Sequence, residues 1–474
     1  MRIVVLGGGP GGTAAALEAA RLGATVTLIE KENLGGTCLN WGCIPTKTIL
    51  RSARIAWDAR NAAEFGLRLP LAGVDEERLL ERKEGVVAEL RGQAESQQSR
   101  AKVDVVYGEG RLLDALTVRV TTADGETDYH ADALILATGS EVFRLPSIDH
   151  SLERVWTSDE ATSIVAIPDS VMIVGGGVIG LEFACAYASF GAEVHVVELT
   201  PAVLPGNDKR VQRATQEALE KMGVVFHLGQ AATSVTQRGD HMYTELPDGQ
   251  VIETDYLLSA VGRKPLSEGF GFAEAGIEMD RAAVKVDENF RTNVPGVFAI
   301  GDLIGGMMLA HVAEEEGIAA ARNAFHLASE PAEDPLGALG RFLNMPSLQS
   351  VDYSCVPACV YTFPEIAVVG FSRDSAKERG LDVVQAVSKY SANGKALGEG
   401  ESDGFVQIIA ENHTGRIVGC QIVGPHAVET IHEVALAKRH RLTVRDVAET
   451  VHAHPTVSEA IKLACADAAA KCGV

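Results

Sequence analysis

The chain of 474 residues carries one segment twice, and this repeat limits the folds that are open to it. Residues 7–30, GGGPGGTAAALEAARLGATVTLIE, align without a gap on residues 175–198, GGGVIGLEFACAYASFGAEVHVVE. Each copy follows a short apolar run and passes through a helix-length apolar pattern to a β-rich run that ends in glutamate. Both copies therefore predict a strand, a tight glycine turn, a helix and a second strand.

Three glycines open each copy at the spacing of a dinucleotide-binding turn. In such a turn the first glycine makes the bend, the second lets the backbone approach a pyrophosphate, and the third lets the helix pack closely on the strand. The helix N-terminus attracts the negative charge. One such motif is a weak indication, but two in this context predict that the chain binds two dinucleotides. The glycines are Gly7, Gly9 and Gly12 in the first copy and Gly175, Gly177 and Gly180 in the second.

Each copy ends in a glutamate, Glu30 or Glu198, which lies 18 residues beyond the last glycine of its turn. A carboxylate at this position binds a ribose diol and repels a 2′-phosphate. The second copy continues as Glu198-Leu199-Thr200, with no arginine nearby to accept a 2′-phosphate. The second copy is therefore expected to bind NAD rather than NADP.

The composition is that of an ordinary globular protein, with 46% hydrophobic and 22% charged residues. No uninterrupted run of about 18 apolar residues occurs, so we expect no membrane-spanning helix. The net charge of −22 argues against a nucleic-acid partner, which would require a basic surface. The first predicted strand begins directly after Met1, which leaves no room for a signal segment and predicts a cytoplasmic protein. Cysteines there are mostly reduced, so a closely spaced pair is a catalytic or metal-binding candidate.

One such pair, Cys38 and Cys43, lies in GGTCLNWGCIPTK, soon after the first copy. A zinc site would need further Cys or His ligands, and the only other close pair lies more than 300 residues away. On a regular α-helix, Cα atoms five residues apart are separated by about 8–9 Å. A disulfide needs about 7 Å or less. Gly42 and Pro45 predict a break that would permit the bond, with regular helix beginning at or after Pro45.

The two thiols would then lie near the positive end of that helix, which favours the thiolate. We therefore expect the pair to cycle between dithiol and disulfide. Zinc ligation and a pair of inert core cysteines stay open as alternatives.

These motifs resemble those of the pyridine nucleotide-disulfide oxidoreductase flavoproteins, and within them the dihydrolipoamide dehydrogenases. The resemblance runs nearly end to end, through the cysteine segment, both glycine turns, ATGS, VGRKP, PGVFAIGD, MLAHVAEEEG, YTFPEIAVVG and HAHPTVSEA. It implies an α/β fold with two Rossmann-like domains, for FAD and NAD, a central domain and an α+β dimerisation domain. The implied boundaries are 1–145 for the FAD domain with the redox disulfide, 146–265 for the NAD domain, 266–342 for the central domain and 343–474 for the dimerisation domain.

The resemblance also implies roles for the residues around the cysteines. Cys38 would be the interchange thiol that reacts with the substrate, and Cys43 would lie beneath the flavin and pass electrons to it. Lys47, one helical turn beyond Cys43, would lie near the reactive edge of the flavin. The resemblance pairs Lys47 with Glu182.

Thiol–disulfide exchange also needs a proton shuttle, and a histidine oriented by a carboxylate is the usual solution. The segment HAHPTVSEA offers His454 and Glu459, more than 400 residues from the cysteines. Folding or a partner chain must therefore bring the two segments together, and in the family the histidine crosses a two-fold dimer. His452, two residues earlier, is expected to be structural.

The remaining cofactor contacts follow from the other motifs. TNVPGVFAIGD predicts a strand that ends at Asp302, an acid that in such flavoproteins faces the ribityl–phosphate portion of FAD. LILATGS and LLSAVGR predict strands followed by glycine, at the points where the chain leaves each nucleotide domain. No metal site is expected. The expected FAD set is Gly7, Gly9, Gly12, Glu30, Lys47, Gly110, Thr138, Gly139, Asp302, Met308, Leu309, Ala310 and His311, and the NAD set is Gly175, Gly177, Gly180, Glu182, Glu198 and Gly262.

The implied activity is the oxidation of dihydrolipoyl groups through FAD with NAD⁺ as acceptor. The expected partners are a second copy of the chain and the lipoyl domains of 2-oxo acid dehydrogenase complexes or of the glycine cleavage system. The alternatives within the family are an NAD(P)H-dependent disulfide or mercuric reductase and an NADH oxidase or transhydrogenase. A non-catalytic FAD-binding redox sensor is the alternative from another class.

Two features depart from the family pattern. Leu266 stands where the family commonly has asparagine, which puts a polar contact there in doubt. Cys465 and Cys472 lie near the C-terminus, where some relatives carry a redox pair, but those pairs are usually adjacent and a redox role for these two is a minor expectation. The other cysteines are expected in the core: Cys185, Cys355, Cys359 and Cys420.

Overall fold

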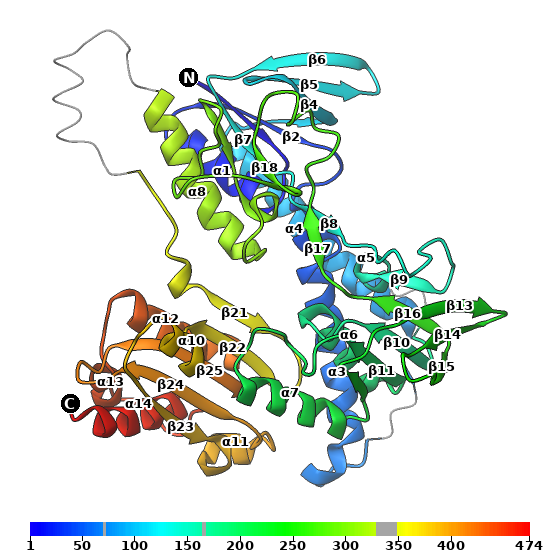
Figure 1. Cartoon of the computed structure of the whole chain (residues 1–474), viewed down its shortest axis with the longest axis vertical. Coiled ribbons are helices and arrows are strands. Elements are labelled where there is room, and N and C mark those ends of the chain that lie inside the picture. The colour runs from blue at the N-terminus through cyan, green and yellow to red at the C-terminus, as the bar shows by residue number, and fades with distance from the viewer. Residues whose placement is uncertain (70–72, 164–166, 329–347) are drawn as a thin grey trace. The chain divides into compact units, whose positions relative to one another are not determined.

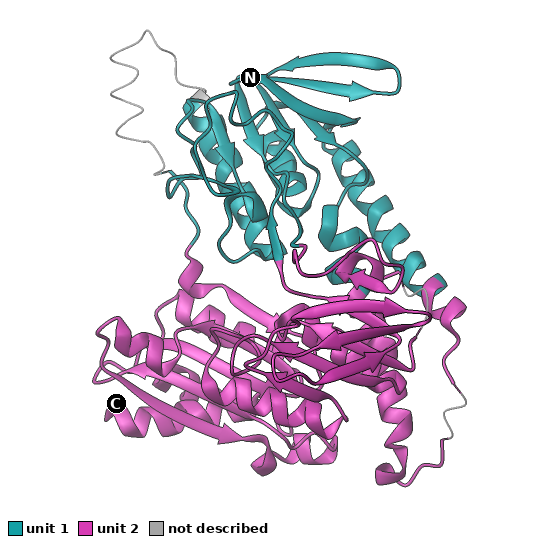
Figure 2. Cartoon of the chain, turned by 45° about the vertical axis from the view of Figure 1, so that its right-hand side comes forward, with its two compact units in different colours: residues 1–45, 81–143, 263–351 teal, residues 46–80, 144–262, 352–474 magenta. Residues whose placement is uncertain are grey.

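The computed structural model describes residues 1–69, 73–163, 167–328 and 348–474. The chain forms two compact units, each assembled from three stretches of sequence (Figure 2). Unit 1 contains Met1–Pro45, Glu81–Phe143 and Arg263–Val351, and unit 2 contains Thr46–Leu80, Arg144–Gly262 and Asp352–Val474. The four domain boundaries expected from the sequence stay a prediction, because compactness separates only these two units.

Unit 1 is built on a parallel sheet whose central strand is the apolar run that precedes the first glycine turn (Figure 1). Its strands are β1 (Arg2–Leu6), β2 (Thr25–Glu30), β3 (Asp104–Tyr107), β7 (Ala133–Leu136) and β20 (Val297–Ala299), in the spatial order β20-β7-β1-β2-β3. A three-stranded antiparallel sheet contains β4 (Glu109–Asp114), β5 (Thr117–Thr122) and β6 (Gly125–His130).

Side chains of β1 alternate between two cores, as the two-residue period of a strand requires. Ile3 and Val5 belong to the core formed with α1 (Pro10–Arg21) and α8 (Ala310–Ala328). Val4 and Leu6 belong to the core formed with β5. The continuous apolar run IVVL is therefore buried on both faces, as is typical of a strand in the middle of a parallel sheet.

Unit 2 repeats this arrangement with the second glycine turn. Its parallel sheet contains β9 (Val155–Thr157), β10 (Ser170–Val174), β11 (Glu193–Glu198), β12 (Val225–Leu228) and β16 (Tyr256–Ser259), in the order β12-β11-β10-β16-β9. Arg2 pairs with Thr25 in unit 1 and Ser170 pairs with Glu193 in unit 2, so the two sheets keep the same register. The strand, turn, helix and strand predicted for each copy are confirmed.

The repeat extends to the surrounding layers. Val171 and Ile173 pack with α6 (Val178–Phe190), while Met172 and Val174 pack with a second three-stranded antiparallel sheet. That sheet contains β13 (Ser234–Arg238), β14 (His241–Glu245) and β15 (Val251–Thr254). The sequence repeat is thus a repeat of a whole three-layer unit, which the 7–30 and 175–198 alignment reveals only in part.

A short ribbon marks where the chain passes between the units. Strands β8 (Ser140–Val142) and β17 (Arg263–Pro265) pair antiparallel, with Arg263 opposite Val142. They begin at the last residues of the segments LILATGS and LLSAVGR, which are Ser140 and Arg263. The chain leaves unit 1 after Phe143 and returns to it at Arg263, as the two predicted crossings require.

The C-terminal part of unit 2, yellow to red in Figure 1, is a five-stranded antiparallel sheet with helices. The spatial order is β21-β22-β25-β24-β23, with β21 (Pro357–Val360), β22 (Glu365–Gly370), β23 (Val383–Lys389), β24 (Phe405–Glu411) and β25 (Ile417–Gly424). The helices are α10 (Arg373–Glu378), α11 (Gly394–Gly398), α12 (Ala427–Arg439), α13 (Val444–Glu449) and α14 (Glu459–Cys472). This α+β part completes the predicted fold class.

Several cysteines lie in these cores. Cys465 and Cys472 both lie on α14 and are buried, so the minor expectation of a redox pair on a C-terminal tail is wrong. Burial raises the pKa of the Cys465 thiol to about 12, which keeps it protonated. Cys185 and Cys420 are fully buried, as predicted. Cys355 and Cys359 are only partly buried.

The remaining elements connect these layers. They are α2 (Gly36–Asn40), α3 (Cys43–Arg60), α4 (Glu76–Arg100), α5 (Ser158–Ala161), α7 (Lys209–Lys221), β18 (Met279–Asp280), β19 (Ala283–Val284), and the 3₁₀ helices η1 (Ala62–Phe65), η2 (Gly301–Ile304), η3 (Tyr353–Cys355) and η4 (Tyr390–Ala392). Among the helices that the structure describes, none has both the length and the apolar character needed to span a bilayer.

Candidate active site

The two cysteines of GGTCLNWGCIPTK lie on separate helices. Cys38 lies within α2 and Cys43 is the first residue of α3, so the predicted helix break between them is confirmed. A Cβ atom at Gly42 would come within 2.8 Å of the Thr37 carbonyl oxygen, which explains why glycine occupies the break. The expectation that regular helix begins at or after Pro45 is wrong. Pro45 lies in the first turn of α3, where the N–H groups have no partner within the helix and a missing donor is tolerated.

The thiols differ in exposure, because Cys38 is partly buried and Cys43 is exposed. Cys43 stands at the N-terminal end of an 18-residue helix, whose dipole favours a negative charge there. The backbone thus places one thiol at a position suited to a thiolate. Within the described ranges, no group of three or more His, Cys, Asp or Glu side chains is arranged to hold a metal ion.

The structure brings together the predicted pair of Lys47 and Glu182, from α3 and α6. Lys47 Nζ lies 2.8 Å from Glu182 Oε2 and 3.0 Å from Oε1. The Glu182 side chain is only 3% exposed, and its Oε1 also accepts a hydrogen bond from the backbone N–H of Tyr361 at 3.0 Å. Two partners therefore satisfy a carboxylate that would otherwise be buried at a large energetic penalty.

His454 and Glu459 also form the predicted pair. His454 Nδ1 lies 3.0 Å from Glu459 Oε1, and the Glu459 carboxylate also accepts a hydrogen bond from Thr456 N–H. The Thr456 N–H, and after it His454, hold the pKa of Glu459 below its usual value. Because a carboxylate only accepts, the proton of neutral His454 lies on Nδ1 and Nε2 can accept another. The His454 side chain is 79% exposed, so this acceptor is accessible.

The glycine turns have the same geometry in both units. A Cβ atom at Gly12 would lie 1.8 Å from the Gly7 carbonyl oxygen, and one at Gly180 would lie 2.0 Å from that of Gly175. Gly7 and Gly175 adopt φ values of 109° and 114°, which favour glycine. The first and third glycines are therefore required by the turn itself.

The second glycine of each turn faces open space. A Cβ atom at Gly177 would meet nothing within 4 Å, and one at Gly9 would meet only the Gly36 Cα at 4.0 Å. These residues are the N-caps of α6 and α1, and no described side chain caps either helix. Each turn therefore leaves a helix N-terminus open to an anion, as a pyrophosphate group requires.

The terminal glutamates make one contact in common. Glu30 Oε2 accepts from Gly8 N–H and Glu198 Oε2 accepts from Gly176 N–H, both at 2.7 Å. Burial raises the pKa of Glu30. Each carboxylate is thereby fixed beside its glycine turn, where a ribose would lie. The residues present therefore fit one dinucleotide at each turn.

Asp302 lies outside the strand in which the sequence predicted it. Strand β20 ends at Ala299, and Asp302 follows in η2, because Gly301 at φ 68° turns the chain. Asp302 Oδ2 accepts from Ser140 Oγ at 2.5 Å, and Ser140 Oγ accepts from Arg263 Nε at 2.8 Å. Sequence reasoning missed both Ser140 and Arg263, although they end the quoted motifs LILATGS and LLSAVGR.

Leu266, where the family commonly has asparagine, makes two hydrogen bonds through its backbone. Thr138 Oγ1 donates to the Leu266 carbonyl oxygen at 2.6 Å, and Leu266 N–H donates to the Gly139 carbonyl oxygen at 2.9 Å. Neither contact depends on the side chain at position 266. Gly139 and Gly262 have φ values of 75° and 110° at the ends of the two crossings.

The other expected FAD residues lie in unit 1. Met308 has a left-handed φ of 47°, Leu309 directly precedes α8, and Ala310 and His311 begin that helix. Gly110 lies in β4, where a Cβ atom would come within 2.5 Å of Leu6 Cδ1. Packing of β4 on the sheet is therefore sufficient to explain this glycine.

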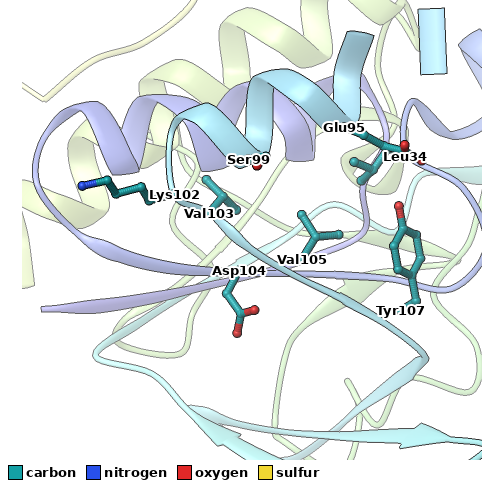
Figure 3. Close-up of a pocket in the computed structure, with 8 residues that line it drawn as sticks. All are labelled: Leu34, Glu95, Ser99, Lys102, Val103, Asp104, Val105 and Tyr107. Atoms are coloured by element: carbon teal, nitrogen blue, oxygen red, sulfur yellow. The ribbon is translucent and has the colours of Figure 1, made fainter. Parts of the chain in front are cut away.

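A separate hollow of about 620 Å³ lies in unit 1 between the end of α4 and strand β3 (Figure 3). Burial, and then the charge of Glu95, raise the pKa of Tyr107 in its wall. None of the predicted site residues lines it. The lining residues are Leu34, Glu95, Ser99, Lys102, Val103, Asp104, Val105 and Tyr107.

Comparisons with known proteins agree with this geometry. Residues 1–317 match the model of the pyridine nucleotide-disulphide oxidoreductase family, and residues 356–465 match the dimerisation domain of that family. The dihydrolipoyl dehydrogenase of Haloferax volcanii is 38% identical over 98% of this chain and 96% of its own length. The enzyme of the same name from Bacillus subtilis is 39% identical over 96% of this chain and 94% of its own length.

A solved structure agrees as well. LpdA from Mycobacterium tuberculosis superimposes with a TM-score of 0.88 at 30% identity, over 98% of this chain and 99% of that protein. These matches confirm the expected fold class, an oxidoreductase activity and the use of FAD and NAD. The chain belongs to the pyridine nucleotide-disulphide oxidoreductase family.

Proposed function

We propose that the chain is a dihydrolipoyl dehydrogenase, which oxidises a dihydrolipoyl dithiol to the cyclic disulfide with NAD⁺ as the final acceptor. The observation that carries the proposal is the exposed His454 held by Glu459, together with two cysteines on either side of a helix break. A dithiol substrate needs both a disulfide to attack and a base for its protons. Relatives that carry this enzyme name cover almost the whole chain.

The residues divide the work as follows. His454 Nε2 takes a proton from one substrate thiol, and the resulting thiolate attacks Cys38 Sγ of a Cys38–Cys43 disulfide. That bond breaks, and Cys43 leaves as a thiolate. The second substrate thiol then attacks the substrate sulfur bound to Cys38, which closes the lipoyl ring and releases Cys38, and its proton passes to the released Cys38 thiolate. Two electrons and two protons leave the substrate, and the cysteine pair is reduced.

FAD would take the electron pair from the reduced cysteines and NAD⁺ would take it onward as hydride. The first glycine turn with Glu30, Thr138, Asp302 and residues 308–311 would hold FAD. The second turn with Glu198 and Gly262 would hold NAD. Lys47, in an ion pair with Glu182 at 2.8 Å, would lie near the reactive edge of the flavin.

The proposal includes the assembly. Two copies of the chain would form a homodimer through the C-terminal part, so that His454 of one copy serves the cysteines of the other. The partners would be lipoyl domains of 2-oxo acid dehydrogenase complexes or of the glycine cleavage system. The four domain boundaries belong to the same proposal. A cytoplasmic location belongs to it as well, because the thiols need a reducing compartment.

The test is anaerobic reduction of the purified flavoprotein with dihydrolipoamide, followed by addition of NAD⁺. We expect a long-wavelength absorbance from a thiolate beside the flavin, and then formation of NADH. Cys43→Ser should remove that absorbance. Absence of both signals in the wild-type protein would disprove the proposal, and faster turnover with NADPH and glutathione disulfide, or with Hg²⁺, would favour a reductase.

A further inference from the structure

Tyr361 contacts both members of the Lys47–Glu182 pair. It directly follows strand β21, in the motif YTFPEIAVVG. Its backbone N–H donates to Glu182 Oε1 at 3.0 Å, and Lys47 Nζ lies 4.5 Å from the centroid of its ring. All three residues lie in unit 2, although they come from three separate segments of the chain.

The Tyr361 ring restricts the Lys47 ammonium on a side that the Glu182 carboxylate does not contact. Glu182 fixes the Lys47 ammonium on one side through two short contacts. Lys47 is a long side chain with high rotamer entropy, and a single carboxylate leaves it free to turn about that contact. The negative face of an aromatic ring attracts an ammonium group and restricts this motion. Lys47 is 30% exposed, so water does not fully screen the attraction.

We infer that Tyr361 is a positioning residue that holds the Lys47 ammonium in place through its ring and Glu182 through its backbone N–H. It acts on the reaction only through these two side chains. The inference rests on the proposed function, in which Lys47 lies near the reactive edge of the flavin. The aromatic face is the essential feature, because the backbone N–H stays in any variant.

The test compares Tyr361→Leu, Tyr361→Met and Tyr361→Phe in the purified holoenzyme. The two aliphatic variants should lower kcat about fivefold to tenfold with KM nearly unchanged, because they remove the cation–π contact. Tyr361→Phe keeps the ring and should stay within about threefold of the wild type. Tyr243→Leu is the matched control, since it removes a cation–π contact with Arg238 at 5.0 Å elsewhere in unit 2.

A second readout does not depend on turnover. Modification of Lys47 by an amine-reactive reagent, measured by peptide mass spectrometry, should rise severalfold in the aliphatic variants and stay near the wild-type level in Tyr361→Phe. Tyr243→Leu should leave both kcat and Lys47 modification unchanged. An aliphatic variant with wild-type kcat, or Tyr361→Phe as slow as Tyr361→Leu, would overturn the inference.

A double variant separates positioning from a general structural effect. If Tyr361 acts through Lys47, Tyr361→Leu should slow the Lys47→Met enzyme no further. If the fold losses of kcat in the two single variants multiply in the double variant, the inference is contradicted. A loss of kcat that parallels a loss of folded protein in circular dichroism would contradict it as well. The rates should be measured with NADH and an artificial dye as well as with dihydrolipoamide. Differences that persist with the dye, while dihydrolipoamide gives no turnover, would count against the proposed substrate and not against Tyr361.

Discussion

Two histidines, separated by one residue, show how local contacts divide roles within the segment HAHPTVSEA. The His452 side chain is 5% exposed, and its two ring nitrogens contact Glu433 Oε1 and the Thr450 carbonyl oxygen. The His454 side chain is 79% exposed, and among the described residues its ring contacts Glu459 through Nδ1. His452 is therefore fixed in the structure, whereas His454 has an exposed ring nitrogen, which the proposed function assigns to the substrate.

His454→Gln should lower kcat about 10²-fold to 10⁴-fold, because it removes the proton acceptor. The flavin spectrum and the thermal midpoint should stay near those of the wild type, since the side chain is exposed. His452→Gln is the matched control: it should lower the thermal midpoint by disrupting the buried contact with Glu433 while the folded enzyme keeps most of its kcat. Steady-state kinetics and thermal unfolding measure both. Equal losses of kcat in the two variants would remove His454 from its role.

At the scale of elements, helices α1 and α8 of unit 1 approach each other closely. A Cβ atom at Gly317 would lie 2.3 Å from the Gly11 carbonyl oxygen, and one at Gly11 would lie 2.8 Å from that of Ala313. The two helices therefore touch through their backbones. Since α1 begins at the first glycine turn, this contact holds against α8 the end of the helix that the proposed function assigns to FAD.

Gly317→Val should destabilise the protein by about 1–3 kcal/mol, because the added atoms have no space between the helices. FAD retention should fall with it. Gly85→Ala is the control, since Gly85 lies exposed on α4 and a Cβ atom there meets nothing within 4 Å. That change should be neutral or stabilising by up to about 1 kcal/mol. Urea unfolding measures the stability of both variants, and release of flavin measures their FAD retention. A Gly317→Val protein with wild-type stability would contradict the close approach.

A buried carboxylate ties the same two helices electrostatically. Glu18 on α1 accepts from Arg21 at 2.7 Å on its own helix and lies 2.6 Å from Arg322 on α8. Arg21, and after it Arg322, lower the pKa of Glu18 to about 2, against the raising effect of burial. The stabilisation is therefore fully present above the unfolded pKa, and it is lost as the pH falls from that value towards about 2.

Glu18→Gln should thus lower the free energy of unfolding by about 1–3 kcal/mol at pH 7. The difference from the wild type should begin to shrink below about pH 4.5, because the Glu18 carboxylate of the unfolded wild-type chain takes up a proton there while that of the folded chain stays ionised. Glu217→Gln, in an exposed pair with Arg213, serves as the control and should change stability by less than about 0.5 kcal/mol. Urea titrations at pH 7, 5 and 3.5 measure the trend. A constant difference across this range would show that Glu18 acts by packing alone.

At the scale of the whole molecule, the proposed homodimer predicts subunit complementation. Cys43→Ser and His454→Gln should each be nearly inactive alone. A mixture that exchanges subunits should recover about a quarter of the wild-type activity, because half of the dimers are mixed and each has one site with both groups intact. Different affinity tags on the two variants, with purification through both tags in turn, isolate the mixed dimers and confirm the exchange. No recovery in confirmed mixed dimers would place His454 in the same chain as the cysteines it serves.

The sequence was informative where local rules apply. The two glycine turns and the helix break at Gly42 follow from residues close together in the chain, and they were predicted correctly. The helix start at Cys43 was missed because the residue before a proline usually avoids helical geometry. In the first turn of α3, Ile44 adopts that geometry although Pro45 follows it. The contacts of Ser140, Arg263 and Tyr361 were missed for another reason: each joins segments far apart in sequence, and no local pattern encodes such distances.

The discontinuous order of unit 1 has a consequence for synthesis on the ribosome. Strand β7 ends at Leu136, but its neighbour β20 begins only at Val297, after the inserted part of unit 2. A nascent chain therefore carries an unpaired strand edge while those intervening residues emerge, and such edges attract other chains. Translation that stops near Gly262 leaves this edge open permanently. Arrested chains of this length are consequently expected to associate more readily than the full chain.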